Sequence, residues 1–224
     1  MHIPEFIPMM ILPKTTLFPE SLLPLHIFEH RYRRMLSDVM NSHRMFCVAM
    51  NYPWTSQEKP MPVAGLGLVR ACVNRADGTS NLLLLGLERV RCLGAQRYKP
   101  YRLERGEVLR ETGGESKSVP LLRDQLKEMI EVRIAQGPKG EVPPSLPSMV
   151  LEAAQQGEAM GDAMSEFGAD LANSIQGVSE LADYAASTFL NNALERQAVL
   201  ESVDVATRLE KVTEFLAAEI ERKN

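Results

Sequence analysis

The side chains that most often perform covalent or acid–base chemistry are few in this chain of 224 residues. A histidine that activates a cysteine would make a thiol site, the enzyme class that these residue types could build. However, no candidate nucleophile stands on a glycine-flanked turn, and no catalytic constellation can be assembled. We therefore expect a protein that is not an enzyme and name no catalytic residue, with an uncharacterised hydrolase open as an alternative. The residues concerned are His2, His26, His30, His43, Cys47, Cys72 and Cys92.

Cofactor and metal sites are not expected either. The three cysteines are odd in number, widely spaced and set among apolar residues, which indicates reduced core thiols rather than disulfides or a zinc site. No histidine joins the carboxylates at helical spacing, so we predict no metal site. The nearest approach to a phosphate-binding Gly-x-x-x-x-Gly-Lys-Ser/Thr loop ends at Lys117 and Ser118, but Glu111 and Ser116 replace both glycines. The sequence therefore predicts no bound ATP and no other cofactor.

The residues from Asn51 to Pro62 form a loop that could bind another polypeptide. This loop contains three prolines and the only tryptophan of the chain. A surface for extended segments needs exposed apolar side chains of adaptable shape, although ordinary packing is the alternative for each of them. The candidate peptide-binding residues are Tyr52, Trp54 and Met61 in this loop, with Arg89 and Arg91 from the arginines of the first half.

A row of acidic residues is a second candidate interaction surface. An expected helix over residues 148–176 carries them at four-residue steps, and like charges at that spacing repel by roughly 0.2 to 0.5 kcal/mol per pair. The row is either a partner-docking stripe for basic groups or a solvated helix face. Its members are Glu158, Asp162, Glu166 and Asp170.

The first half of the chain, residues 1–118, consists of short strands and one early helix. Apolar runs and alternation bounded by prolines and turn residues mark the strands. The pattern predicts an α+β protein whose first domain is a closed or nearly closed β-barrel with mixed connections. The expected strands are Met9–Leu12, Leu22–Phe28, Met45–Met50, Val63–Arg75, Leu82–Cys92 and Tyr98–Leu109, and the helix is Glu29–Asn41.

Local details of this half are also predictable. Asp77 and Gly78 are a turn pair that predicts a tight hairpin with positive φ at both positions. A bulge is expected near Gly86, where the alternation changes face. Glu29 is expected in the first helical turn, four residues before Arg33 and so at a favourable pair spacing. Val69, Ala71 and Val73 are expected on one face of their strand.

The second half, residues 119–224, is expected to be helical. Besides the helix over residues 148–176, apolar stripes at three- and four-residue steps indicate Pro120 to Ile134, Glu180 to Phe189, Leu194 to Leu200, and Val205 to Arg222. Ser179 and Asp204 stand where N-caps of the second and fourth of these helices are needed.

Charge and hydropathy limit the partners and the location. Residues 1–118 carry 16 Lys and Arg against 11 Asp and Glu, a net of +5, while residues 119–224 carry 9 against 18, a net of −9. The basic half keeps RNA binding open as an alternative, but interleaved glutamates argue against it and nucleic acid is not an expected partner. No apolar run approaches the roughly 18 residues of a membrane span, and no basic signal start is present, so we expect a cytoplasmic protein without a membrane partner. A homo-oligomer stays open.

Five stretches carry a resemblance to a known family. They are LFPESLLPLHIFEHRY at Leu17 to Tyr32, Gly67 to Val73, Asp77 with Gly78, GLERVR at Gly86 to Arg91, and SELADYAASTFLNNALERQAVLESVDVATRLEKVTEFL at Ser179 to Leu216. They resemble the N-terminal substrate-recognition domain of Lon proteases, and more closely its free-standing bacterial versions. The resemblance implies a PUA-like β-barrel followed by a helical subdomain, and a role in binding polypeptide substrates or protein partners. It also implies that the family's ATPase and protease domains are missing.

The family motif residues are expected mainly to maintain the fold. They are Phe18, Pro19, Phe28, Glu29, Arg31, Tyr32 and Gly86. Two positions depart from the family pattern: Glu20 stands where glycine is usual, and His30 where proline is common. The turn beside Glu20 is therefore the place where a structural difference is expected.

Overall fold

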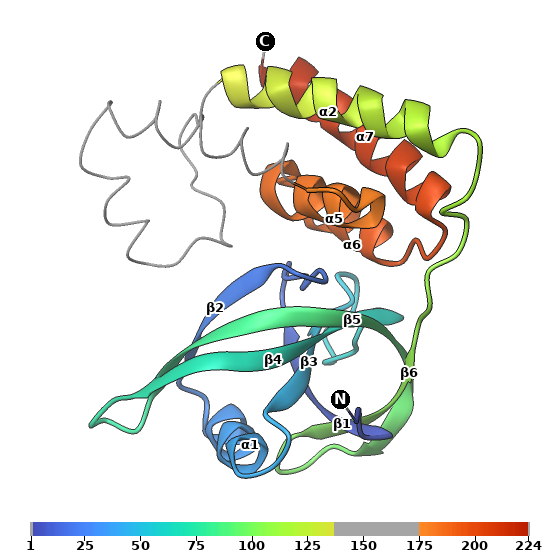
Figure 1. Cartoon of the computed structure of the whole chain (residues 1–224). Coiled ribbons are helices and arrows are strands. Elements are labelled where there is room, and N and C mark those ends of the chain that lie inside the picture. Colours follow the sequence, from blue (N-terminus) through green and yellow to red (C-terminus); the bar gives the residue numbers. More distant parts are fainter. Residues whose placement is uncertain (1, 137–174, 224) are drawn as a thin grey trace. The chain divides into compact units, whose positions relative to one another are not determined.

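The computed structural model describes residues 2–136 and 175–223 (Figure 1). The chain divides into two compact units, Met1–Arg110 and Glu111–Asn224. Unit 1 contains all the named strands, and the described part of unit 2 is helical. The expected α+β class is therefore confirmed.

Unit 1 is a six-stranded mixed sheet with one helix. Its strands are ordered β2-β5-β4-β3-β1-β6, and β5 additionally pairs with β6. The pair β1–β3 is parallel and the other pairs are antiparallel. The elements are β1 (Phe6–Leu12), β2 (Leu22–Ile27), α1 (His30–Met40), β3 (Met45–Met50), β4 (Val63–Asn74), β5 (Ser80–Arg97) and β6 (Arg102–Val108).

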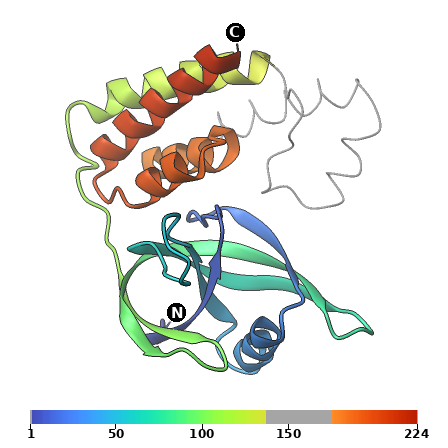
Figure 2. The same ribbon diagram turned by 180° about the vertical axis from the view of Figure 1, so that it is seen from behind.

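The long strand β5 explains why the sheet is curled. Its first half pairs with β2 and β4, and its second half pairs with β6 (Figures 1 and 2). Among the named strands, β2 pairs only with β5 and therefore remains an edge. The sheet is mixed as expected, and of the two expected forms, closed or nearly closed, it has the nearly closed one, because β5 pairs with both β4 and β6 while β2 remains a free edge.

The apolar residues of unit 1 form two clusters. One lies between α1 and the sheet, where Met35 and Val39 of the helix pack with Phe46 and Leu84 of the strands. The other lies within the curled sheet and includes Cys47. All three cysteines are free, but only Cys47 is fully buried, while Cys72 and Cys92 are partly buried at the margins of the two clusters.

The segment before β2 packs against glycines of the sheet. Leu17 and Phe18 are almost completely buried, and a Cβ at Gly86 would overlap the carbonyl oxygen of Phe18. The backbone N–H of Glu20 donates to the Gly86 oxygen, and Glu20 has a φ of 58°. This left-handed conformation is the one that glycine adopts without strain, so the chain keeps a glycine-type turn although glutamate occupies the position.

The β4–β5 hairpin differs from the expected pattern in two ways. A register shift between Val69 and Ala71 reverses the alternation, so Val73 is 65% exposed while Val69 is buried. The three residues expected on one face are thus divided. Of the two turn residues, only Gly78 has a positive φ, at 79°, because the Asp77 carboxylate instead accepts hydrogen bonds from Thr79. The bulge expected near Gly86 is confirmed by the register shift there.

The described helices of unit 2 are α2 (Val119–Ala135), α5 (Val178–Phe189), α6 (Ala193–Leu200) and α7 (Val205–Lys223). Helices α2 and α7 lie side by side (Figures 1 and 2). Asp204 caps α7 as expected, accepting from the Thr207 N–H at 2.8 Å. Ser179 does not cap α5, since Gly177 is the N-cap residue and the Ser179 hydroxyl donates to Glu111. The acidic row of Glu158, Asp162, Glu166 and Asp170 lies outside the described residues.

Candidate polypeptide-binding loop

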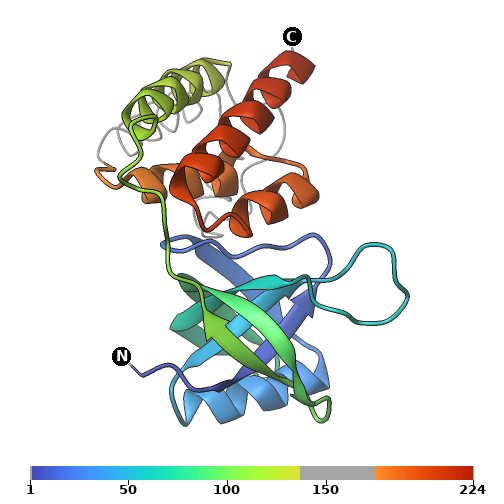
Figure 3. The same ribbon diagram turned by 90° about the vertical axis from the view of Figure 1, so that its right-hand side faces the viewer.

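The loop between β3 and β4, residues 51–62, extends outward from the sheet of unit 1 (Figure 3). Backbone hydrogen bonds hold its two ends. The Asn51 N–H donates to Leu12 O at 2.9 Å, and the Met61 N–H donates to Met50 O at 2.8 Å. Further along, the Tyr52 N–H donates to Lys59 O at 2.7 Å. The base of the loop is therefore fixed by the same kind of bonds that hold the sheet.

The outer part of the loop presents an aromatic pair to solvent. Trp54 is 74% exposed, and its ring meets the Tyr52 ring edge-on, with centroids 5.7 Å apart. The Lys59 ammonium lies over the other ring, 5.1 Å from the Tyr52 centroid. Exposed aromatic rings bury large areas when a partner covers them, so the loop offers an anchor for an apolar side chain beside a cation.

An ion-pair cluster connects this loop to helix α1. The Arg31 guanidinium uses Nη1 to bind Glu58 at 2.7 Å and Nε to bind Glu29 at 2.9 Å. Its hydrogen bond with the Glu58 carboxylate is the main cause that raises the pKa of Arg31. Glu29 is the N-cap residue of α1 and pairs with Arg31, so the expected pair with Arg33 is corrected. We call Glu29, Arg31 and Glu58 the Arg31 cluster.

The buried Tyr32 ring packs against the guanidinium of the Arg31 cluster. The side chain is only 4% exposed, and the Arg31 guanidinium lies 4.4 Å from its ring centroid. The phenol oxygen accepts from the Ile11 N–H at 3.1 Å and can donate to Ile11 O at 3.2 Å or to Glu58 at 3.4 Å. Burial raises the pKa of Tyr32 to about 12, which keeps the phenol protonated at neutral pH. Tyr32 therefore fixes α1 to strand β1 directly under the loop.

The structure brings together two groups of residues that we selected separately from the sequence. Tyr52, Trp54 and Met61 share the loop, and the family motif residues Arg31 and Tyr32 contact it through Glu58, with Glu29 paired to Arg31. Glu58 was not among the candidates because its partner Arg31 is far away in the chain and no spacing rule connects them. Glu58 is the only carboxylate among residues 51–62, and this is the one sequence signal that could have drawn attention to it.

Other expected residues do not join this site. Arg89 is 2% exposed, so its side chain cannot receive a peptide from solvent, and its selection as a binding residue is corrected. Arg91 is half-exposed and binds Glu107 at 3.1 Å. Phe28 does not contribute to the core, because it is 62% exposed and stacks on His26. The half-buried Pro19 follows the buried Phe18.

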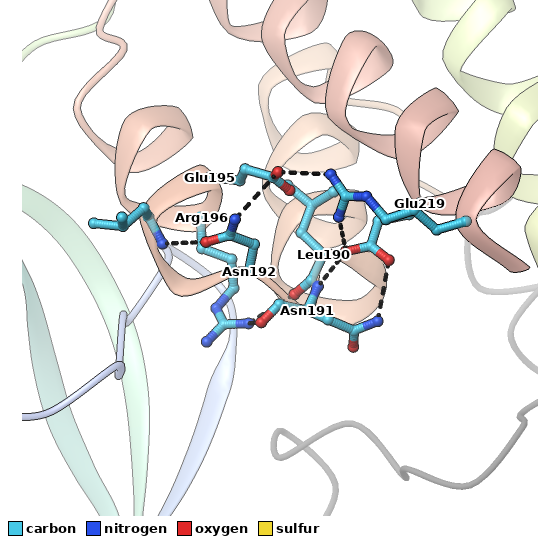
Figure 4. Close-up of polar contacts among 8 residues, drawn as sticks. Leu190, Asn191, Asn192, Glu195, Arg196 and Glu219 are labelled. Atoms are coloured by element: carbon cyan, nitrogen blue, oxygen red, sulfur yellow. Dashed lines mark hydrogen bonds and ion pairs between the residues drawn. The ribbon is translucent and has the colours of Figure 1, made fainter.

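Polar clusters in unit 2 hold its helices together. In Figure 4 the buried Glu219 of α7 accepts bonds from the N–H and the side chain of Asn191, in the turn between α5 and α6. Arg196 donates to the Leu190 and Asn191 carbonyl oxygens, and burial lowers its pKa. These side chains satisfy the backbone groups of a helix end, which is a structural use.

A second cluster surrounds the fully buried Arg208 of α7. Its Nη1 binds the Glu111 carboxylate at 2.6 Å and lies 3.5 Å from Asp183. Its Nε donates to Ser202 O at 2.8 Å. The cluster fixes the first residue of unit 2 to helices α5 and α7.

The cysteines are poorly suited to chemistry. Burial raises the pKa of Cys92 to about 12 and that of Cys47 well above its ordinary value. Since the thiolate is the reactive form, both thiols are protonated and unreactive at neutral pH. Over residues 2–136 and 175–223, no three His, Cys, Asp or Glu side chains are grouped to hold a metal ion. No helix in those ranges is long and apolar enough to cross a membrane.

Two solved structures that are similar to this chain are Lon N-terminal domains. The N-terminal domain of Mycobacterium avium complex Lon protease superposes with a TM-score of 0.65 at 17% identity, covering 95% of this chain and 98% of that one. A Lon N-terminal domain protein from Xanthomonas campestris gives 0.60 at 16% identity, covering 94% and 98%. The fold is therefore that of a Lon N-terminal domain.

The sequence defines the family directly. The family model described as "ATP-dependent protease La (LON) substrate-binding domain" matches residues 7–218, so the chain belongs to this family. The Lon protease of Dictyoglomus thermophilum is 25% identical over 227 residues, and that of Desulfosudis oleivorans is 25% identical over 226. These matches cover 98% of this chain but 25% and 24% of the relatives, so the chain spans about a quarter of their length.

Proposed function

We propose that this protein is a non-enzymatic module that binds extended or unfolded polypeptide segments, and that it does so with the loop of residues 51–62. Membership of a substrate-binding family supports the general role. The observation that carries the specific proposal is the 74% exposure of Trp54 on a loop whose base is held by backbone hydrogen bonds.

The chemistry of the loop fits such a partner. A fixed loop loses little conformational freedom on binding, so the apolar area covered on Trp54 and Tyr52 contributes to affinity. The Lys59 ammonium makes a contact with the Tyr52 ring and no ion pair with a described residue. It can therefore meet a carbonyl or carboxylate of the bound segment. The protein contributes recognition in this proposal and no covalent step.

Substitution of Trp54 tests the proposal. A central aromatic anchor contributes about 2 kcal/mol or more, so Trp54→Ala is expected to weaken capture of a permanently unfolded model protein by roughly 30-fold. Affinity is measured by anisotropy of the labelled model protein, in the full chain. Gln57→Ala is the matched control, because Gln57 is an exposed neighbour whose side chain makes no hydrogen bond or ion pair with a residue that the structure describes. Equal affinity of wild type and Trp54→Ala would refute the loop as the binding site.

A further inference from the structure

The side chains at the outer end of the loop have few polar contacts outside it. Trp54 contacts Tyr52, and the Thr55 hydroxyl accepts from the Gln57 N–H, so both contacts stay within the loop. Over residues 53–58, Glu58 is the one side chain with a hydrogen bond or ion pair to another element of the described chain. Contact between this end of the loop and α1 therefore depends on one carboxylate.

We propose that the Arg31 cluster positions the Trp54 loop for polypeptide binding, with Glu58 and Arg31 as positioning residues. This inference rests on the proposed function and adds what controls the site. The cluster holds the loop against α1, so that the Tyr52 and Trp54 rings face an incoming segment in one arrangement. Loss of the Glu58 carboxylate leaves the base of the loop bonded and frees its outer end.

The chemistry of Arg31 suits this role better than lysine would. Its planar guanidinium reaches Glu29 and Glu58 with two different nitrogens while its face lies on the Tyr32 ring. Tyr32 is itself bonded to the Ile11 backbone, so the guanidinium rests on a fixed support. The loop is thus connected through Glu58 to a rigid helix and strand.

The cluster also makes the position of the loop sensitive to salt. The side chains of Arg31, Glu29 and Glu58 are 38 to 40% exposed, so solvent ions reach them. The screening length falls from about 10 Å in 0.1 M salt to about 3 Å in 1 M salt. High salt is therefore expected to weaken the hold on the loop in the same way as removing Glu58.

The single tryptophan allows a direct test in the free protein, without any ligand. Trp54 is the only tryptophan of the chain, so fluorescence anisotropy reports the loop alone. Glu58→Ala is expected to lower the anisotropy, and Gln57→Ala to leave it unchanged. Wild type in about 1 M NaCl is expected to approach the Glu58→Ala value, which itself does not respond to salt. Arg31→Lys should give an intermediate value, because one carboxylate stays paired.

Binding measurements separate this inference from the proposed function. Exposed ion pairs contribute about 0.2 to 1 kcal/mol, so Glu58→Ala should weaken capture of the unfolded model protein by a factor of roughly 1.4 to 5. Unchanged anisotropy in Glu58→Ala would overturn the positioning role. Lower anisotropy with full affinity would overturn it as well, while the larger loss in Trp54→Ala would still support the proposed function. If neither variant loses affinity, both proposals fail.

Discussion

Arg208 is the largest fully buried side chain of the described residues, and it is charged. Its guanidinium is surrounded by Glu111, Asp183 and the Ser202 carbonyl oxygen. Such a charge is tolerated only when partners replace water, and removal of one member leaves the others uncompensated. Asp183 is 3% exposed, so water replaces the guanidinium beside its carboxylate less readily than at the partly exposed Glu111.

We predict that Arg208→Met lowers the free energy of unfolding by about 3 to 5 kcal/mol, the usual effect of breaking a buried ion pair. Urea unfolding followed by circular dichroism measures the change. Arg123→Met is the control, since Arg123 of α2 binds Asp124 at 2.8 Å and both side chains are exposed, 40% and 61%. Its substitution should cost about 1 kcal/mol or less. Similar losses in the two variants would contradict the importance of burial.

At the level of elements, periodic patterns predicted most helices and strands, because burial of one face determines which residues are apolar. The failures lie where one residue changes local geometry. A bulge at the register shift between Val69 and Ala71 exposes Val73. The strand preferences of the residues do not predict a bulge of this kind. Ser179 has the residue type of an N-cap, but a tertiary bond to Glu111 takes its hydroxyl instead.

At the scale of elements, Gly86 is the position where the packing of two segments most clearly requires glycine. The turn before β2 passes so close to β5 that a Cβ at Gly86 would overlap the Phe18 carbonyl oxygen, a backbone atom that cannot rotate away. We predict that Gly86→Ala lowers the free energy of unfolding by about 2 kcal/mol or more, because the turn and the sheet must separate. Thermal unfolding measures the loss.

Gly114→Ala is the control for Gly86→Ala. A Cβ there meets no atom within 4 Å, and its φ is not positive. This substitution should change stability by about 0.5 kcal/mol or less, or raise it slightly by restricting the unfolded chain. A Gly86→Ala protein as stable as this control would show that the turn can shift without cost.

At the scale of the whole molecule, composition could predict the loop but not its connection to α1. The only tryptophan among prolines marks residues 51–62 as unusual, and the exposure of Trp54 fits that prediction. The pairing of Arg31 with Glu58 requires the loop between β3 and β4 to lie beside the first turn of α1, which no local sequence pattern predicts. Arg89 was selected for its charge, and its burial depends on a register change in β5 that charge does not reveal.

The positive charge of the first half suggests affinity for nucleic acid, but the structure pairs many of its arginines internally. Ion pairs to carboxylates engage Arg31, Arg34, Arg91, Arg102 and Arg105. A guanidinium already paired with a carboxylate displaces few counterions from a phosphate backbone, and those released counterions supply most non-specific affinity. The excess of basic residues in the sequence therefore overstates the charge available to a polyanion.

We predict that the full chain binds mixed-sequence single-stranded RNA more weakly than a Kd of about 10⁻⁴ M, the weak end of non-specific binding, even at low salt. Electrophoretic mobility shift across a salt series is the measurement. Glu107→Gln removes the partner of Arg91 and serves as the internal comparison, because it frees one cation at the surface of the same sheet. A wild-type affinity that falls steeply as salt rises would favour an RNA-binding module over the polypeptide-binding one. Without such a fall, the loop of residues 51–62 remains the candidate for recognition.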